Sequence, residues 1–161
     1  MVIKTRKKLG DILVEANKIR EDQLKYALKL QNKKGDRLGK ILVDEGIISE
    51  KEILEVLEFQ LGIPHVDLKQ FYIEPKVLKT VPESLARKHN IIPINLHNNI
   101  LTVAMNDPLN IFIIDEIKLV SGKEIQPAIA LEEDIRTTIE YYYGKQTVEK
   151  AVEDFTKEYS H

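Results

Sequence analysis

The chain has 161 residues, of which 24 are Lys or Arg and 26 are Asp or Glu, and it contains no Cys and no Trp. A hydrophobic share of 43% beside 31% charged residues is typical of a water-soluble globular core and argues against disorder. The composition therefore excludes disulfides, thiol catalysis, zinc–thiolate sites, a globally basic nucleic-acid binder and a membrane span of roughly 20 apolar residues.

The charge is unevenly distributed along the chain. Residues 1–37 carry a net charge of +6, whereas residues 38–144 carry −7 and residues 145–161 carry −1. A basic segment on an otherwise acidic chain indicates a local anionic partner, with a solvated lysine-rich face as the alternative.

An internal repeat occupies the first third of the chain. Residues 8–31 and 37–60 align without gaps over 24 positions, nine of them identical, with a spacer of five residues between the copies. Two copies are too few for a solenoid, which needs about three repeats to bury its faces. Each copy is predicted to form a short helix, a turn and a longer helix.

The helix signals differ between the two copies. In the second copy, Gly46 suits the left-handed end of a helix, and Ser49 with Glu52 forms a capping box in which each side chain accepts from a backbone N–H. In the first copy, Asn17 takes the place of Gly46 and Arg20 takes the place of the serine cap. We therefore expect a looser turn and a weaker helix start in the first copy.

Some repeated positions are not explained by helix packing. A cation begins each copy, a glutamine closes each copy, and a glycine lies near each predicted helix start. Glycine costs about 1 kcal/mol relative to alanine inside a helix, but it allows another group to approach the backbone closely. A cation, free N–H groups at a helix N-terminus and such a glycine together describe an anion cradle.

The chain after the repeats is predicted to form a small α/β unit. In chain order, the patterns predict a loop that leads into a short extended segment over 62–68, and then helices over 75–81 and 82–89. Strands over 91–97 and 100–105, a helix over 109–120, a strand over 124–130 and a helix over 131–143 follow. Asn98-Asn99 indicates a type I′ hairpin turn, and Gly122 and Gly144 are expected to end their helices.

The paired pattern Lys/Arg-Leu-Gly-x-x-Leu…Gln resembles the N-terminal regulatory domain of type II secretion and type IV pilus assembly ATPases, in its cyclic di-GMP-binding form. The segments 62–68 and 104–110 are similar to that family as well. The resemblance covers roughly residues 8–144, and a two-part motif with fixed spacing is far more specific than a short pattern.

The resemblance and the patterns together imply an α+β fold. Residues 1–62 are expected to form a helical subdomain, built from the tandem helix-turn-helix repeat, that binds the nucleotide. Residues 63–144 are expected to form a small three-stranded α/β subdomain, and residues 145–161 a C-terminal helix or the start of a linker to an ATPase domain absent from this chain.

The resemblance implies that the ligand is cyclic di-GMP, a two-fold symmetric bacterial second messenger, held by one half-site in each repeat. Arg37 can meet guanine O6 and N7 in a bidentate way, the glutamines can bind base edges or phosphates, and the leucines can cover the purines. The predicted ligand-binding residues are Lys8, Leu9, Gly10, Leu13, Asn17, Leu24, Leu28, Gln31, Arg37, Leu38, Gly39, Leu42, Gly46, Ile53, Leu57, Gln60 and Asp107.

Two of these positions carry a particular expectation. Lys8 stands where the family has arginine, and because lysine lacks the planar fork, the first half-site is expected to bind more weakly or to contact phosphate. Asp107 can accept from guanine N–H donors, with an ordinary Asn-Asp-Pro turn as the alternative.

The predicted function is therefore a regulatory domain that binds cyclic di-GMP and controls a pilus or secretion ATPase. Its expected partners are the downstream hexameric ATPase domain and an inner-membrane platform protein, with no nucleic acid, no cofactor, no metal and no transmembrane span. The expected location is the cytoplasm, peripheral to the inner membrane through those partners. The alternative is a docking domain that anchors the ATPase to the platform protein without binding nucleotide.

An enzymatic function is not expected. The ATPase phosphate-binding loop needs Gly-x-x-x-x-Gly-Lys-Ser/Thr, and residues 35–40 come nearest to it but are one residue too short. The four histidines have no spacing that makes a metal set.

Overall fold

The computed structural model describes the backbone of residues 8–159, and the side chains of residues 8–145 and 151–156. The chain divides between His65 and Val66 into two compact units, which are described separately here. Within the described residues, no helix has both the length and the apolar character that crossing a bilayer requires. Four helices in the first unit and a three-stranded sheet with helices in the second make this an α+β protein, as predicted.

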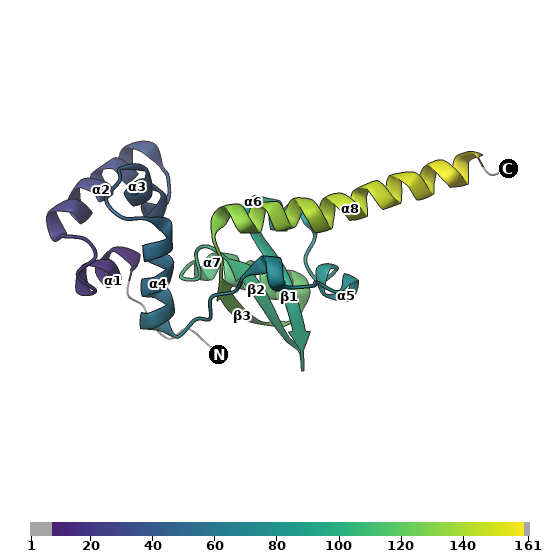
Figure 1. Ribbon diagram of the computed structural model, residues 1–161, viewed down its shortest axis with the longest axis horizontal. Coiled ribbons are helices and arrows are strands. Elements are labelled where there is room, and N and C mark those ends of the chain that lie inside the picture. The colour runs from purple at the N-terminus through teal and green to yellow at the C-terminus, as the bar shows by residue number, and fades with distance from the viewer. Residues whose placement is uncertain (1–7, 160–161) are drawn as a thin grey trace. The chain divides into compact units, whose positions relative to one another are not determined.

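The first unit repeats the same pair of helices twice, as the sequence repeat predicts (Figure 1). A seven-residue helix is followed by a turn and a longer helix in each copy. The four helices are α1 (Leu9–Glu15), α2 (Glu21–Lys34), α3 (Leu38–Asp44) and α4 (Glu50–Leu61).

The turns inside the two copies have the same backbone geometry. Asn17 has a φ of 59° and Gly46 a φ of 71°, so both residues lie in the left-handed region. Their N–H groups donate to the carbonyls of Val14 and Val43 respectively, each at 3.0 Å. The expectation of a looser first turn is therefore wrong, because asparagine adopts the left-handed conformation that the turn needs.

The longer helices begin with different caps. The Ser49 hydroxyl accepts from the Glu52 N–H at 3.1 Å, as predicted, but it also donates to the Glu52 carboxylate at 3.1 Å. The predicted role of that carboxylate as an acceptor for a backbone N–H is thus wrong. In the first copy the Gln23 amide oxygen accepts from the Arg20 N–H at 2.8 Å, which supplies half of a capping box.

The second unit is built on a three-stranded sheet in the order β1 (Ile91–His97), β2 (Ile100–Met105) and β3 (Glu124–Ile129). The first two strands are antiparallel and the last two are parallel. The turn between β1 and β2 has positive φ values at Asn98 (49°) and Asn99 (67°), which confirms the predicted hairpin.

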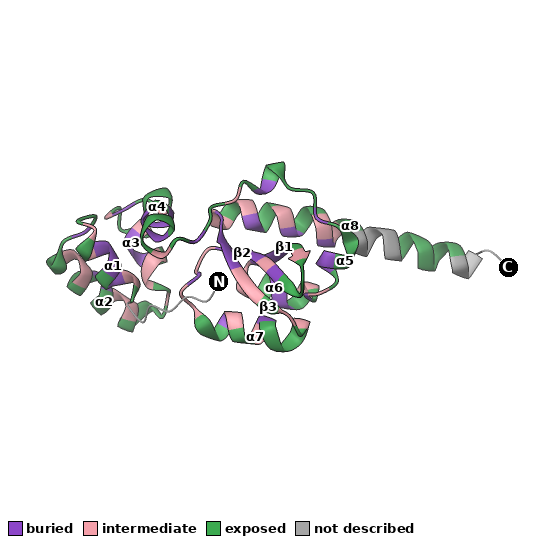
Figure 2. Cartoon of the chain, turned by 90° about the horizontal axis from the view of Figure 1, so that it is seen from below, coloured by how far each residue is buried: buried purple, intermediate pink, exposed green. Residues whose placement is uncertain are grey.

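Helices cover both faces of the sheet, with α8 on one face and α7 on the other (Figure 2). The helices of this unit are the 3-10 helix η1 (Leu68–Gln70) and the α-helices α5 (Pro75–Leu78), α6 (Glu83–His89), α7 (Ile111–Ser121) and α8 (Glu132–Tyr159). The helix predicted from residue 109 begins at Ile111, because the Asn110 side chain accepts from the Ile113 N–H and caps it there. Gly122 ends α7 with a φ of 70°, as predicted.

Helix α8 continues through Gly144, so the prediction that the helix ends there is wrong. Gly144 is not among the glycines with positive φ, and the helix is held in place before it by buried contacts. Tyr143 is 3% exposed, and its hydroxyl lies 2.8 Å from the Val81 carbonyl oxygen. Burial raises the pKa of this hydroxyl.

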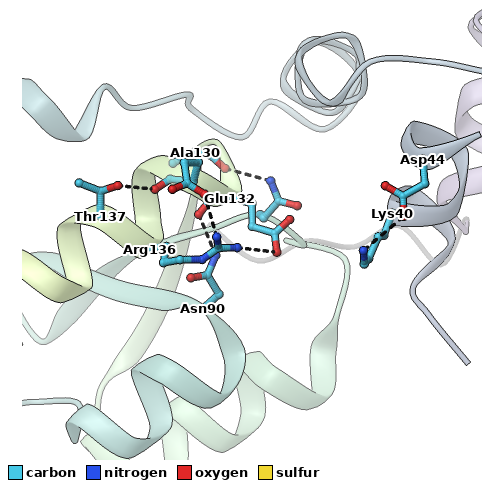
Figure 3. Close-up of polar contacts among 9 residues, drawn as sticks. Lys40, Asp44, Asn90, Ala130, Glu132, Arg136 and Thr137 are labelled. Carbon is cyan, nitrogen blue, oxygen red and sulfur yellow. Dashed lines mark hydrogen bonds and ion pairs between the residues drawn. The ribbon is translucent and has the colours of Figure 1, made fainter. Parts of the chain in front are cut away.

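At the start of α8, the Asn90 side chain donates to the Glu132 carbonyl at 3.0 Å (Figure 3).

Candidate nucleotide-binding site

The structure places sixteen of the seventeen predicted site residues in the first unit, where the two repeats contact each other. Asp107 belongs to the second unit. There it lies in the turn between β2 and α7, where its carbonyl accepts from the Asn110 N–H at 3.2 Å. The neighbouring Asn106 side chain donates to the Ala130 carbonyl at 3.2 Å. These contacts support the alternative of an ordinary turn, and the ligand role of Asp107 stays a prediction.

The two predicted cations occupy equivalent positions. Lys8 immediately precedes α1 and Arg37 immediately precedes α3, and both residues are exposed with extended backbone. Their carbonyls accept the first intrahelical bonds, from Ile12 (3.2 Å) and Ile41 (3.1 Å). Each cation is therefore carried at the same point of a seven-residue helix, followed by leucine and glycine.

The leucines that follow the cations reach across to the opposite repeat. A Cβ atom built on Gly10 would lie 3.3 Å from Leu38 Cδ2, and a Cβ atom built on Gly39 would lie 3.4 Å from Leu9 Cδ2. The first leucine of each copy therefore comes into contact range of the glycine of the other copy. The two half-sites predicted from the sequence are thus interlocked and do not lie in separate halves of the unit.

Equivalent apolar residues of the two repeats are buried to different degrees. Leu13 and Leu42 are both 0% exposed, so in this conformation they belong to the core beneath the site. Leu28 is 41% exposed, whereas its equivalent Leu57 is 2% exposed. At this pair of positions, the first repeat therefore presents an apolar side chain to solvent and the second does not.

The two glutamines lie near the C-terminal ends of the longer helices. Gln31 is half-buried in α2, and Gln60 is exposed in α4. The Gln31 backbone carbonyl accepts from the Gly35 N–H at 2.8 Å, at the end of α2.

One contact between the repeats was not predicted from the sequence. The Tyr26 hydroxyl donates to the Glu45 carboxylate at 2.9 Å, which joins α2 to the end of α3 and raises the pKa of Tyr26. The position equivalent to Tyr26 in the second repeat holds Glu55, and the position equivalent to Glu45 in the first repeat holds Ala16. The repeat pattern therefore gave no indication of this hydrogen bond.

Two ion pairs on the surface of this unit join residues of a single segment. The Arg20 guanidinium beside Asp22 holds the pKa of that carboxyl below its usual range through a side-chain hydrogen bond of 3.0 Å. Lys40 and Asp44 pair at 3.2 Å on the exposed face of α3 (Figure 3). Exposed pairs of this kind contribute little stability.

The chain is similar in sequence to several proteins, including the following three. It is 41% identical to the type IV pilus assembly ATPase PilB of Myxococcus xanthus, over 86% of this chain and 25% of that protein. It is 33% identical to PilB of Thermus thermophilus, over 94% of this chain and 21% of that protein. It is 25% identical to the type II secretion system protein E of Xanthomonas campestris, over 86% of this chain and 25% of that protein. The chain thus spans about a fifth to a quarter of these relatives.

Two solved structures share its fold. The structure of MshE with cdg has a TM-score of 0.75 and 32% identity, covering 86% of this chain and all of that one. The N-terminal domain of XpsE has a TM-score of 0.70 and 22% identity, covering 84% of this chain and 97% of that one.

The family model of the MshEN domain matches residues 61–149, which is more than half of the chain. The alignments with PilB and MshE cover 86% of the chain or more, so they extend beyond that segment into the tandem repeats. The chain therefore belongs to the MshEN domain family, and its relatives include type IV pilus assembly ATPases and a type II secretion system protein E.

Proposed function

We propose that this chain is a regulatory domain that binds cyclic di-GMP through its tandem repeat and controls a type IV pilus or type II secretion ATPase. The observation that carries the proposal is the pair of equivalent units, each with a cation, a leucine and a glycine at the start of a short helix. A two-fold symmetric ligand fits a two-fold repeated site. The likeness to MshE, which was solved with cdg (cyclic di-GMP), supports the same ligand.

The roles follow from the chemistry of the side chains. Arg37 supplies the planar fork that suits guanine O6 and N7, whereas Lys8 supplies a point charge that suits a phosphate. Gln31 and Gln60 offer both donors and acceptors to bases or phosphates. The half-exposed leucines supply apolar surface for the purine faces.

Titration calorimetry with cyclic di-GMP tests this proposal. We expect saturable binding by the wild-type chain, and a loss of affinity of 100-fold or more in the double variant Arg37→Ala/Gln60→Ala, since each lost contact to a charged or base group costs about 1–3 kcal/mol. Lys118→Ala, a cation of the second unit, is the control and should bind like the wild type. The absence of saturable binding up to about 100 μM, a free energy near −5.5 kcal/mol, would contradict the proposal.

The regulatory step requires that the ligand binds two arrangements of the protein with different affinity. In this proposal the domain acts at the cytoplasmic side of the inner membrane, on a downstream hexameric ATPase domain, and it is peripheral through its partners. The PilB relatives, named as type IV pilus assembly ATPases, and the relative named type II secretion system protein E support a role beside such an ATPase.

A second candidate function is docking of the ATPase to an inner-membrane platform protein. Helix α7 favours it, because Phe112 is 83% exposed and Leu119 is 84% exposed. Exposed large apolar side chains on one helix are typical of protein–protein contacts. Pull-down with the cytoplasmic domain of the platform protein separates the candidates: docking alone predicts capture that cyclic di-GMP does not change and that Phe112→Ser/Leu119→Ser abolishes.

A further inference from the structure

The two glycines of the tandem repeat have different surroundings. A Cβ atom built on Gly10 would lie 2.5 Å from Leu24 Cδ1 and 3.1 Å from Leu24 Cδ2. The first of these distances is shorter than real Cβ contacts allow, so the Leu24 side chain occupies the space that the missing Cβ leaves. Gly10 is correspondingly buried. Helix packing is a sufficient reason for a glycine at this position.

The equivalent glycine of the second repeat is not covered in this way. A Cβ atom built on Gly39 would lie 3.9 Å from Ile53 Cδ1, the residue equivalent to Leu24, and 3.4 Å from Leu9 Cδ2. These are ordinary contact distances, and Gly39 is only half-buried. Alanine would fit there and is the better helix former, so packing does not explain the glycine. A group that approaches this backbone from outside the chain does explain it.

The side chains around the two glycines also differ in their freedom to move. Leu24 is half-buried, and Leu28 on the next turn of α2 is 41% exposed. Their equivalents in α4, Ile53 and Leu57, are 6% and 2% exposed. Leu24 can therefore swing towards solvent without opening the core, whereas Ile53 is held in place by the core around it.

We propose that the two half-sites are unequal: the second is open and pre-formed at Gly39, and Leu24 closes the first at Gly10 until the ligand displaces it. The inference rests on the proposed function and specifies how that site is regulated. The residue at the 24/53 position decides the state of its half-site. Leucine branches at Cγ and reaches over the glycine, whereas isoleucine branches at Cβ and leaves the glycine open.

The chain itself supplies the test, because the two residues can be exchanged. Leu24→Ile gives the first repeat the residue of the second, and Ile53→Leu does the reverse, with side-chain volume kept in both cases. By calorimetry with cyclic di-GMP, we expect Leu24→Ile to lower Kd three- to tenfold and Ile53→Leu to raise it by a similar factor. Leu30→Ile, on α2 but outside the site, is the matched control and should leave Kd within twofold.

A second measurement needs no ligand. In NMR spectra of the wild-type chain, a water-soluble gadolinium chelate should broaden the Gly39 amide signal more than the Gly10 signal. Leu24→Ile should increase the broadening at Gly10, and Ile53→Leu should reduce it at Gly39.

The outcomes of these experiments distinguish a failure of the proposed function from a failure of the closure by Leu24. If the wild-type chain shows no saturable binding, the proposed function fails and the unequal half-sites fall with it, whatever the gadolinium experiment shows. If the wild-type chain binds but Leu24→Ile leaves Kd unchanged or raises it, or if both glycine amides broaden equally, the proposed function stands and the closure by Leu24 is wrong.

Discussion

Asn17 and Gly46 show how two different residues meet one backbone requirement. Both turn the chain between a short and a longer helix with a positive φ, and each donates its N–H to the carbonyl three residues before it. Glycine does so without steric cost, and asparagine is the most tolerant of the residues that carry a Cβ. The stability of each turn therefore depends on the residue at this one position.

Substitution at Gly46 tests that dependence. Gly46→Ala should lower the free energy of unfolding by about 1 kcal/mol, because a Cβ is strained at a φ of 71°. No heavy atom lies within 4 Å of the added Cβ, so a steric clash does not contribute. Gly46→Asn should cost clearly less, as Asn17 already occupies the equivalent position. Urea denaturation followed by circular dichroism measures both variants, and equal losses would contradict the explanation.

At the scale of elements, α8 is the helix whose length differs most from expectation. The pattern up to Tyr143 predicts a helix that ends at Gly144, because glycine is the most frequent residue just after a helix. The helix instead runs from Glu132 to Tyr159, and Gly144 lies in its interior. Glycine there lowers helix stability without providing a left-handed cap.

This difference predicts the sign of a substitution. Gly144→Ala should raise the free energy of unfolding by up to about 1 kcal/mol, because the added Cβ has its nearest neighbour, a Glu140 carboxylate oxygen, at 4.0 Å. Gly122→Ala is the matched control and should lower it by about 1 kcal/mol, since Gly122 ends α7 with a φ of 70°. A loss of stability in Gly144→Ala, seen by thermal or urea unfolding, would show that the helix ends at this residue.

At the scale of the whole molecule, the chain consists of two compact units with different means of stabilisation. The first unit packs four helices around residues such as Leu42, which is 0% exposed. In the second unit, a sheet is covered by helices on both faces and α8 is fastened through Tyr143. Because each unit has its own core, a local defect should stay local.

A pair of core substitutions tests the independence of the units. Leu42→Ala should destabilise the first unit by about 2–5 kcal/mol through the cavity it leaves. Tyr143→Phe should destabilise the second unit by about 1–2 kcal/mol, because the buried Val81 carbonyl loses its donor. Native-state hydrogen exchange should show faster exchange in α1–α4 for the first variant and in β1–β3 for the second. Faster exchange throughout the chain in either variant would contradict independence.

Much of the fold could be predicted from local signals. The repeat, the hairpin at Asn98-Asn99 and the Gly122 helix end follow from residue types whose conformational preferences act over a few positions. The end of α8 could not be predicted in this way, because local signals do not include the buried contacts of Tyr143 with a segment more than sixty residues away. The Ser49 cap was predicted, but the Glu52 carboxylate accepts from the Ser49 hydroxyl and not from a backbone N–H.

The candidate site could likewise be predicted only in part from the sequence. The sequence by itself determined the two equivalent units, with Lys8 and Arg37 at matching positions, because the same spacing of residues places the helix starts at the same points of both copies. Only the tertiary structure decided that Leu9 and Leu38 cross to the opposite repeat. It also decided that Leu24 fills the space beside Gly10, while no side-chain atom beyond those of its chain neighbours lies closer than 3.4 Å to a Cβ built on Gly39. The reason is that exposure depends on what packs against a side chain from elsewhere in the chain, and two similar repeats in one unit have different neighbours.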